Sequence, residues 1–358
     1  MFQPQTYLLA LLFMITSMLC WGSWGNTVKL ARGWRFQLLY WDYTWGLVLG
    51  MLFWGFTLGS IHSGPASFLP ALASADRSHW LWALAGGALF NVANLLLVAA
   101  IEIAGLAVAF PIGIGLALVV GVLLDYLLKP QGNPLLLFGG VALVAAAIVL
   151  DALAYRRRDV AAAQPRASAA AGAESGIVSG PAASAGHAGP AAALARRGLL
   201  ISLACGILMG LFYPLVGKSM LGPGRLGPYA VAFVFSLGVL LSTFPANGWL
   251  MRYPLDGNSP LAPREYWHGR AGAHLAGLCG GFIWATGGVF NFVAAHAHLI
   301  GPAVSYAIGQ GATMIAAIWG VFIWREFAAA PRRVTRLLFW MFACFLVGLG
   351  AVAVAPLF

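Results

Sequence analysis

The chain has 358 residues, of which 61% are hydrophobic and only 8% are charged, and its mean hydropathy is +0.85. Soluble globular domains carry about 25% charged residues, so this composition excludes a soluble protein and indicates an integral membrane protein. The formal net charge of +10 would suit a nucleic-acid partner, but membrane topology explains it better, and we expect no such partner. The four cysteines lie in apolar runs without metal-ligand spacing, so no metal site and no cofactor are predicted.

Apolar runs of about 20 residues, the length that crosses a bilayer as a helix, recur along the whole chain. We read the first run as a retained helix rather than a signal peptide, because it lacks a basic n-region. The sequence therefore predicts an all-α integral membrane fold with ten transmembrane helices. Their predicted bounds are 7–28, 42–61, 80–101, 105–128, 134–153, 199–218, 228–247, 271–294, 300–323 and 337–357.

One connection is much longer than the others. Residues 154–198 are rich in Ala, Gly, Ser and Pro, a composition that cannot bury apolar surface and predicts a disordered linker. The linker divides the chain into two five-helix halves, residues 1–153 and 199–358. Because five is odd, the second half enters the membrane in the opposite sense, which predicts two inverted repeats of the kind found in many secondary transporters.

Residues 105–126 and 301–326 echo each other. Gly105 corresponds to Gly301 and Phe110 to Tyr306, and both segments carry a small residue at every fourth position. This spacing lets helices approach closely within lipid, so the small residues taken alone indicate helix packing more often than function. The second copy is more polar than the first, which suggests that recognition is concentrated there. The polar residues that distinguish it are Ser305, Tyr306, Gln310 and Thr313.

The positive charges predict an orientation. All of the 20 Lys and Arg residues except Arg77, Lys129, Lys218 and Arg225 lie in loops that follow odd-numbered spans. Cytoplasmic loops carry the excess of Lys and Arg. We therefore expect both termini outside, the linker in the cytoplasm, and a multi-pass protein of the cytoplasmic membrane.

No charged residue lies at the middle of a predicted span. Glu102, Asp125, Asp151 and Lys218 lie at span ends, where a long side chain can reach the interface and a short one can cap a helix at little cost. This pattern excludes a channel built on rings of charge and favours a pathway for a neutral or weakly charged solute.

Asn91 and Asn94 are three residues apart and so lie on one helical face. An amide in hydrocarbon costs several kcal/mol unless it is paired, so both side chains must contact another helix or a wet cavity. Binding of substrate and simple bonding between helices are about equally compatible with this pattern. In the first span, Trp24 and Asn26 suit stacking beneath a sugar or a flat heterocycle, although an interfacial aromatic belt is the more common role for tryptophan there.

Three residues are candidates for ion coupling. Asp42 is expected to cap the start of the second span, and it could also contact substrate or a proton. Glu102 lies at a span end, and His298 lies in the turn before the ninth span, where a histidine could titrate near neutral pH. The adjacent Arg325 and Glu326 predict a local ion pair at the end of the ninth span.

These features resemble the drug/metabolite transporter superfamily, in which ten helices form two five-helix halves and the ninth span ends as GVFIWRE does here. The segments AFPIGIGLALVVGVLLDY and LLYWDY resemble its sugar-porter and ureide-permease branch. The resemblance implies a secondary carrier, usually proton-coupled, for small polar solutes such as sugars or oxidised purine derivatives. No GxxxxGK[ST] motif occurs in the sequence, so ATP binding is not predicted.

The favoured interpretation is a transporter that works by alternating access, with its site between the halves. Its alternative is an exporter of drugs or amphipathic metabolites on the same fold. A membrane enzyme is not expected, because no catalytic cluster of side chains is present. Expected partners are the lipid bilayer, a small-molecule substrate and a coupling proton, and a homodimer is compatible with the sequence. The predicted substrate-binding residues are Trp24, Asn26, Asn91, Asn94, Tyr306, Gln310 and Thr313.

Overall fold

The computed structural model describes residues 1–174, 190–255, 258–297, 299–328 and 330–358, and throughout these ranges the regular elements are helices. The elements of the first half are α1 (Tyr7–Ser23), α2 (Asn26–Leu30), α3 (Phe36–Phe56), η1 (Leu58–Ser60), α4 (Phe68–Ala73), α5 (Arg77–Ala104), α6 (Leu106–Leu128) and α7 (Pro134–Glu174). Those of the second half are α8 (Pro190–Ser219), α9 (Pro228–Arg252), η2 (Pro263–His268), α10 (Ala271–His296), α11 (Pro302–Gly309), α12 (Ala312–Ile318), η3 (Trp319–Ile323), α13 (Arg332–Val354) and η4 (Ala355–Leu357).

Within the described residues, nine helical segments are long and apolar enough to cross a membrane. They coincide with every predicted span except 42–61. That span overlaps α3, which begins six residues earlier, ends at Phe56, and with 21 residues has the necessary length. Its composition is less apolar because it contains Gln37, Asp42 and several Trp and Tyr side chains. The prediction of an all-helical membrane protein is therefore confirmed, and the structure establishes nine of the ten predicted spans by length and composition.

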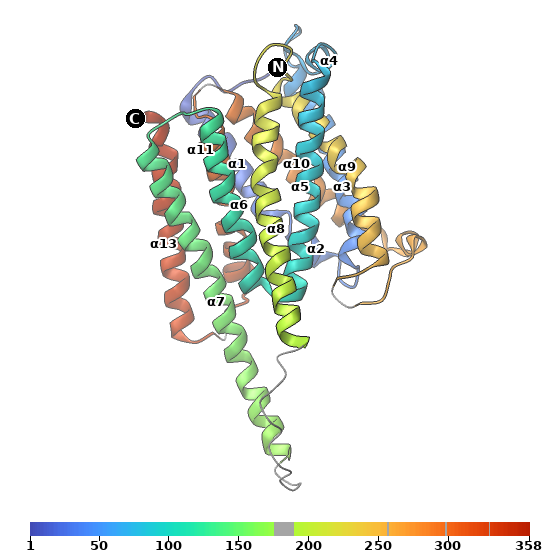
Figure 1. Ribbon diagram of the computed structural model, residues 1–358, viewed down its shortest axis with the longest axis vertical. Coiled ribbons are helices and arrows are strands. Elements are labelled where there is room, and N and C mark those ends of the chain that lie inside the picture. The colour runs from blue at the N-terminus through green and yellow to red at the C-terminus, as the bar shows by residue number, and fades with distance from the viewer. Residues whose placement is uncertain (175–189, 256–257, 298, 329) are drawn as a thin grey trace.

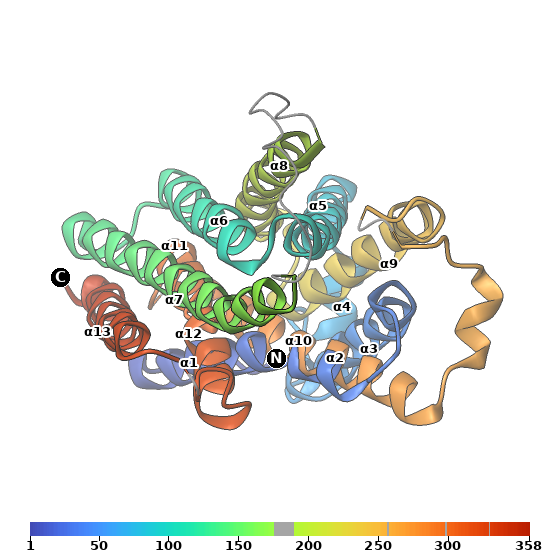
Figure 2. The same cartoon turned by 90° about the horizontal axis from the view of Figure 1, so that it is seen from below.

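The helices form an upright bundle with both chain termini at one end (Figure 1). The end of α7 and the start of α8 lie at the opposite end, which we call the linker end. Both helices extend into the predicted linker 154–198, since α7 continues to Glu174 and α8 begins at Pro190. Viewed along the bundle, α7 and α13 pack together at one flank and α3 and α9 at the other (Figure 2).

Helices α3 and α10 cross in backbone contact through a pair of glycines. A Cβ atom on Gly46 would overlap the carbonyl oxygen of Leu278, three residues before Gly281. A Cβ atom on Gly281 would in turn overlap the carbonyl oxygen of Tyr43, three residues before Gly46. Such reciprocal contact requires glycine on both helices, because a backbone oxygen cannot move aside as a flexible side chain can.

Helices α5 and α9 cross in the same way. A Cβ atom on Gly87 would overlap the carbonyl oxygen of Phe235, and one on Gly238 would overlap that of Leu84. Each of these carbonyls again lies three residues before the partner glycine. The two crossings thus have the same geometry. In this comparison α3 corresponds to α9, and α10 corresponds to α5.

The echoing segments also share a backbone feature. Gly105 (φ 78°, ψ 158°) precedes α6 and Gly301 (φ 81°, ψ 159°) precedes α11, so both helices begin from the same left-handed glycine. Beyond that point they differ, because α6 is continuous whereas the ninth span is broken at Gln310 and Gly311, between α11 and α12. A π-helical turn, η3, then ends the span. The predicted span 300–323 is thus confirmed as the membrane-crossing segment Pro302–Ile323, and its helix is interrupted rather than continuous.

Candidate substrate site

Asn91 and Asn94 on α5 form a buried hydrogen-bond network between helices. Asn91 Oδ1 accepts hydrogen bonds from the hydroxyls of Tyr40 on α3 (2.8 Å) and Thr243 on α9 (3.3 Å). Asn91 Nδ2 donates to Ser242 Oγ on α9 (2.9 Å), and Asn94 Nδ2 donates to the Tyr40 hydroxyl (3.1 Å). The network therefore links α3 and α5 of the first half to α9 of the second.

An aromatic stack leads from this network to the first span. Trp24, which follows α1, packs against Tyr43 with ring centroids 4.9 Å apart, and Tyr43 stacks on Tyr40 at 5.1 Å. Tyr43 is fully buried, and its hydroxyl has no hydrogen-bond partner among the described residues. A buried hydroxyl without a partner costs about 1–3 kcal/mol, so its retention calls for an explanation. Trp24, Tyr43, Tyr40, Asn91 and Asn94 together are called the amide–aromatic cluster below.

The amide–aromatic cluster is closed in this conformation. The small cavity beside it holds about 10 Å³ and is lined by side chains that include Phe36, Gln37 and Leu95. Binding pockets for drug-sized ligands have volumes of about 300–1,000 Å³. A solute could therefore enter only after α3, α5 and α9 separate.

A second buried network lies in the other half, around Asn291 on α10. Its amide contacts the hydroxyls of Tyr213 on α8 and Ser17 on α1 (3.3 Å). It also exchanges hydrogen bonds with Ser305 on α11, donating to the carbonyl oxygen at 3.0 Å and accepting from the hydroxyl at 3.2 Å. Sequence reasoning missed Asn291 as a functional candidate, although an amide within a span is the same signal that identified Asn91.

The three predicted residues of the ninth span have separate environments. Tyr306 is fully buried, its hydroxyl bonds the carbonyl oxygen of Met209 on α8 at 3.2 Å, and its ring lies where a Cβ atom on Gly121 would fall. Thr313 donates to the carbonyl oxygen of Gln310 at 2.9 Å. Gln310 is half-buried and stands at the break between α11 and α12. The structure thus does not join these side chains to the amide–aromatic cluster.

Aromatic rings fill the space between the two polar networks. Trp284 on α10 stacks on Trp21 of α1 at 5.4 Å and contacts Phe90 of α5 at 4.5 Å. It also stacks on Phe235 of α9 at 5.8 Å. Four helices from both halves thus meet at one apolar centre, which any change in the relative position of the halves must rearrange.

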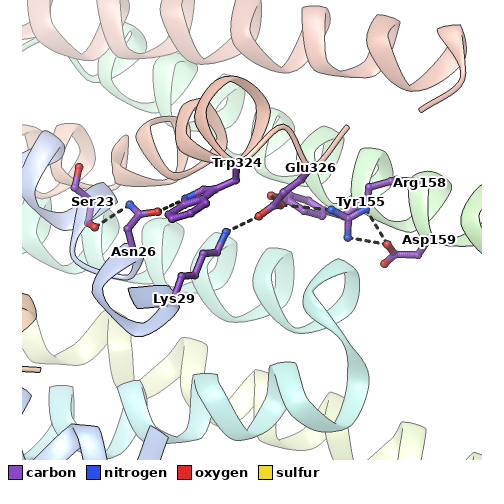
Figure 3. Close-up of polar contacts among 8 residues, drawn as sticks. All are labelled: Ser23, Asn26, Lys29, Tyr155, Arg158, Asp159, Trp324 and Glu326. Atoms are coloured by element: carbon purple, nitrogen blue, oxygen red, sulfur yellow. Dashed lines mark hydrogen bonds and ion pairs between the residues drawn. The ribbon is translucent and has the colours of Figure 1, made fainter. Parts of the chain in front are cut away.

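A network of charges ties the halves at the linker end (Figure 3). Glu326, just beyond η3, accepts from Lys29 of α2 (2.5 Å) and from Tyr155 of α7 (2.9 Å), and it pairs with Arg158 of α7 at 3.4 Å. The predicted local ion pair with Arg325 is wrong, because these partners come from the first half. We call Glu326, Lys29, Tyr155 and Arg158 the linker-end tie.

Asn26 belongs to the surroundings of this tie and lies apart from the amide–aromatic cluster. Its side chain donates to the carbonyl oxygen of Ser23 (2.9 Å) and accepts from the indole of Trp324 (2.6 Å) (Figure 3). Lys29 lies over the Trp324 ring, 4.9 Å from its centroid. The polar contacts of Asn26 therefore attach the first span to the end of the ninth.

Burial acts to raise the pKa of Glu326, but hydrogen bonds from Lys29 and Tyr155 and the positive charges of Lys29 and Arg158 outweigh it. The pKa of Glu326 consequently lies below its ordinary value. Such a carboxylate contributes its attraction above its ordinary pKa of about 4.3 and loses it only as pH falls further. The Glu326 carboxylate is therefore ionised throughout the physiological pH range.

Two carboxyl groups differ from their predicted roles. Asp42 does not cap a helix, because α3 begins at Phe36, and its oxygens bond Tyr266 (2.6 Å) and His274 (2.9 Å). Asp125 does not reach the interface or cap a helix, because it is 1% exposed and has no hydrogen-bond partner among the described residues.

The other two coupling candidates are Glu102 and His298. Glu102 lies on α5, near its end at Ala104. His298 lies outside the described residues.

A family model for the ureide permeases matches residues 39–175, from α3 to α7. The chain is similar to the ureide permeases, a family of transporters. It is 26% identical to ureide permease 2 and 25% identical to ureide permease 1 of Arabidopsis thaliana, each over 96% of both chains. Ureide permease 3 of the same plant is 31% identical over 42% of both chains.

The matched segment spans four of the five residues of the amide–aromatic cluster, and Trp24 lies before it. One solved crystal structure superposes on this chain with a TM-score of 0.58 and 15% sequence identity. The match covers 96% of this chain and 97% of the chain in that structure. That likeness shows a shared fold. The ureide-permease names denote membrane transporters, and the prediction that this chain is not an enzyme is confirmed.

Proposed function

We propose that the chain is a secondary transporter that carries a ureide, or a similarly small polar solute such as a nucleobase or sugar, across the cytoplasmic membrane by alternating access. The observation that carries the proposal is the amide–aromatic cluster, which lies at a contact between the two halves of this chain. The similarity of the chain to ureide permeases indicates the class of solute. Amides and phenols match the alternating donors and acceptors of a ureide, and indole and phenol rings suit a flat solute.

The proposed architecture is a pair of inverted five-helix repeats, in which α3 also crosses the membrane and brings the number of spans to ten. It places the chain in the drug/metabolite transporter superfamily. Three observations support it. The α3–α10 and α5–α9 crossings use one glycine geometry, Gly105 and Gly301 share one backbone conformation, and both termini lie at one end. Two further packing pairs also have counterparts: α5 packs on α8 as α10 does on α1, and α7 packs on α6 as α13 does on α11.

The proposed transport cycle opens the ends of the bundle in turn. The linker-end tie holds one end closed, and the concentration of Lys and Arg there supports a cytoplasmic location for that end. Breaking the tie would let the halves separate and expose the amide–aromatic cluster to the cytoplasm. Within this proposal Gln310 and Thr313, at the break in the ninth span, are the contribution of the second half to the solute site.

Tyr43→Phe is expected to raise the KM for allantoin, a ureide, about tenfold, because loss of one hydrogen bond to a polar solute costs roughly 1.4 kcal/mol. The melting temperature should not fall, since the Tyr43 hydroxyl has no protein partner to lose. The measurement is uptake of labelled allantoin into proteoliposomes. Tyr126→Phe, at a half-buried ring that packs on Phe138, is the matched control. An unchanged KM in the Tyr43 variant would remove this hydroxyl from the site.

Gln310→Leu tests the contribution of the broken span. Leucine is close to glutamine in size, so the change removes the amide at the α11–α12 break with little effect on packing. Uptake of allantoin is expected to fall while the melting temperature stays constant, because Gln310 has no side-chain hydrogen bond to another described residue in the closed state. Uptake equal to that of the wild type would contradict a solute contact at Gln310.

A further inference from the structure

Asp125 is a buried acidic side chain in α6 that neither the fold nor the substrate site explains. It lies one turn before the end of the helix, is 1% exposed, and has no hydrogen-bond partner for either carboxylate oxygen among the described residues. An ionisable side chain within a span is expensive and usually functional. Its counterpart in the echoing segment is the apolar Val321, so the repeat does not require an acid here.

The Asp125 side chain lines a cavity of about 50 Å³ at the end of the bundle where the termini lie. The cavity has walls from both halves: α6 contributes Asp125, α8 contributes Gly217, and α11 contributes Pro302. Gly217 lies beside the carboxylate, since a Cβ atom there would be 3.9 Å from Asp125 Oδ1.

The size of the cavity and the charges that line it indicate which kind of ligand it could hold. One water molecule needs roughly 10–15 Å³ of such space, so a few waters fit, whereas a ureide or sugar does not. A hard metal cation would require about six oxygen ligands. The lining instead offers one carboxylate together with the positively charged Lys129 and Arg225. A proton is the cation that suits one carboxylate in such surroundings.

We propose that Asp125 binds and releases the proton that drives transport. The proposal rests on the transport function argued above. When the cavity is open to the outside, an O–H bond forms on one carboxylate oxygen and the side chain becomes neutral. When the halves rock, that O–H bond breaks, the proton leaves toward the other side, and the carboxylate charge returns.

Titratable side chains on α8, α10, α11 and the adjoining loops surround Asp125. Burial and the charge of Arg225 lower the pKa of Lys129, which makes it easier for this amine to give up a proton beside Asp125. The titratable groups that line the cavity or lie within electrostatic range of Asp125 are Lys129 beyond the end of α6, Arg225 between α8 and α9, His296 on α10, Tyr213 on α8 and Tyr306 on α11.

Two of these groups connect the proton site to the contacts between the halves. The hydroxyl of Tyr213 bonds Asn291, which contacts Ser17 of α1. The hydroxyl of Tyr306 lies 3.4 Å from the carbonyl oxygen of Ala117 on α6 and 3.2 Å from that of Met209 on α8, so it contacts both halves. A change in the charge of Asp125 therefore acts directly on side chains that hold α1, α8, α10 and α11 together, which is the physical requirement for coupling.

The test separates coupled from uncoupled movement in proteoliposomes. With one proton per solute, an inward pH gradient of one unit can drive an accumulation of at most about tenfold. Asp125→Asn, which resembles the neutral acid, is expected to accumulate no solute above the external concentration. It should still exchange labelled for unlabelled allantoin without a gradient, since exchange needs no net proton movement. Asp159→Asn, at an exposed carboxyl of α7, is the matched control and should accumulate solute as the wild type does.

A second measurement judges Asp125 independently of transport. Infrared difference spectra of the purified protein at stepped pH should show a protonated carboxyl band that disappears in Asp125→Asn. Full gradient-driven accumulation by the variant, or persistence of the band, would overturn the proposal. Failure of wild-type protein to exchange or accumulate allantoin would instead count against the proposed substrate and function, and the infrared result would still stand.

Discussion

Replacing Gly238 by alanine is expected to lower the melting temperature of the purified transporter by roughly 3–10 °C, because overpacking costs about 1–3 kcal/mol. The added methyl would overlap the carbonyl oxygen of Leu84 where α9 crosses α5. Relief would require the two helix backbones to move apart, which would also separate Asn91 from Ser242 and Thr243. Thermal melting in detergent, followed by the loss of monodisperse protein, measures the effect.

The same helix provides the control. Gly248 lies ten residues later in α9, and a Cβ atom there would meet nothing within 4 Å. Gly248→Ala should leave the melting temperature unchanged or raise it slightly, since alanine reduces the freedom of the unfolded chain. Equal melting temperatures for the two variants would show that the crossing tolerates a side chain and that the close backbone approach is not required.

Glu326→Gln is expected to shift the conformational equilibrium several-fold toward a state open at the linker end. The change leaves the charges of Lys29 and Arg158 without their common anion. Lys29 is 45% and Glu326 23% exposed, so solvent weakens each contact. A network of two such pairs contributes about 1–2 kcal/mol, which corresponds to a shift of roughly 5- to 30-fold.

Spin labels on cysteines at the exposed positions Arg32 and Arg333, in an otherwise cysteine-free background, can measure this opening as a distance between the halves. Asp159→Asn is the control, because its bond to Arg158 lies within α7 and does not cross between the halves. The pKa of Glu326 lies below its ordinary value, so the wild-type distances should be constant between pH 5 and 8. Opening of the wild type across that range would contradict an ionised tie.

The sequence predicted the parts of the fold that depend on hydrophobicity along one helix. Nine spans and the glycine starts of α6 and α11 follow from local patterns. Aromatic residues and Asp42 weakened the signal of α3, in which Asp42 is buried through its tertiary contacts with Tyr266 and His274. The break at Gln310 has no comparable signature, since both glycines beside it also fit a continuous packed helix.

The candidate substrate site was predictable only in part, because it depends on how the helices pack together. Two amides on one face correctly indicated that Asn91 and Asn94 need partners on other helices, but the identity of those partners is a property of packing. Tyr40 and Tyr43 stood in an aromatic run that resembles an interfacial belt. Asp125 was assigned to an interface because position along a span gives depth but not the direction in which a short side chain points.

The division of the ninth span has a mechanical meaning. Its first piece, α11, packs against α6 and α10 and less extensively against α1 and α13, whereas α12 packs mainly against α1. A rigid rod held by all of these neighbours would have to bend or slip whenever α1 moved relative to α6. In the proposed rocking of the halves, the break at Gln310 and Gly311 would let α12 move with α1 while α11 stays against α6.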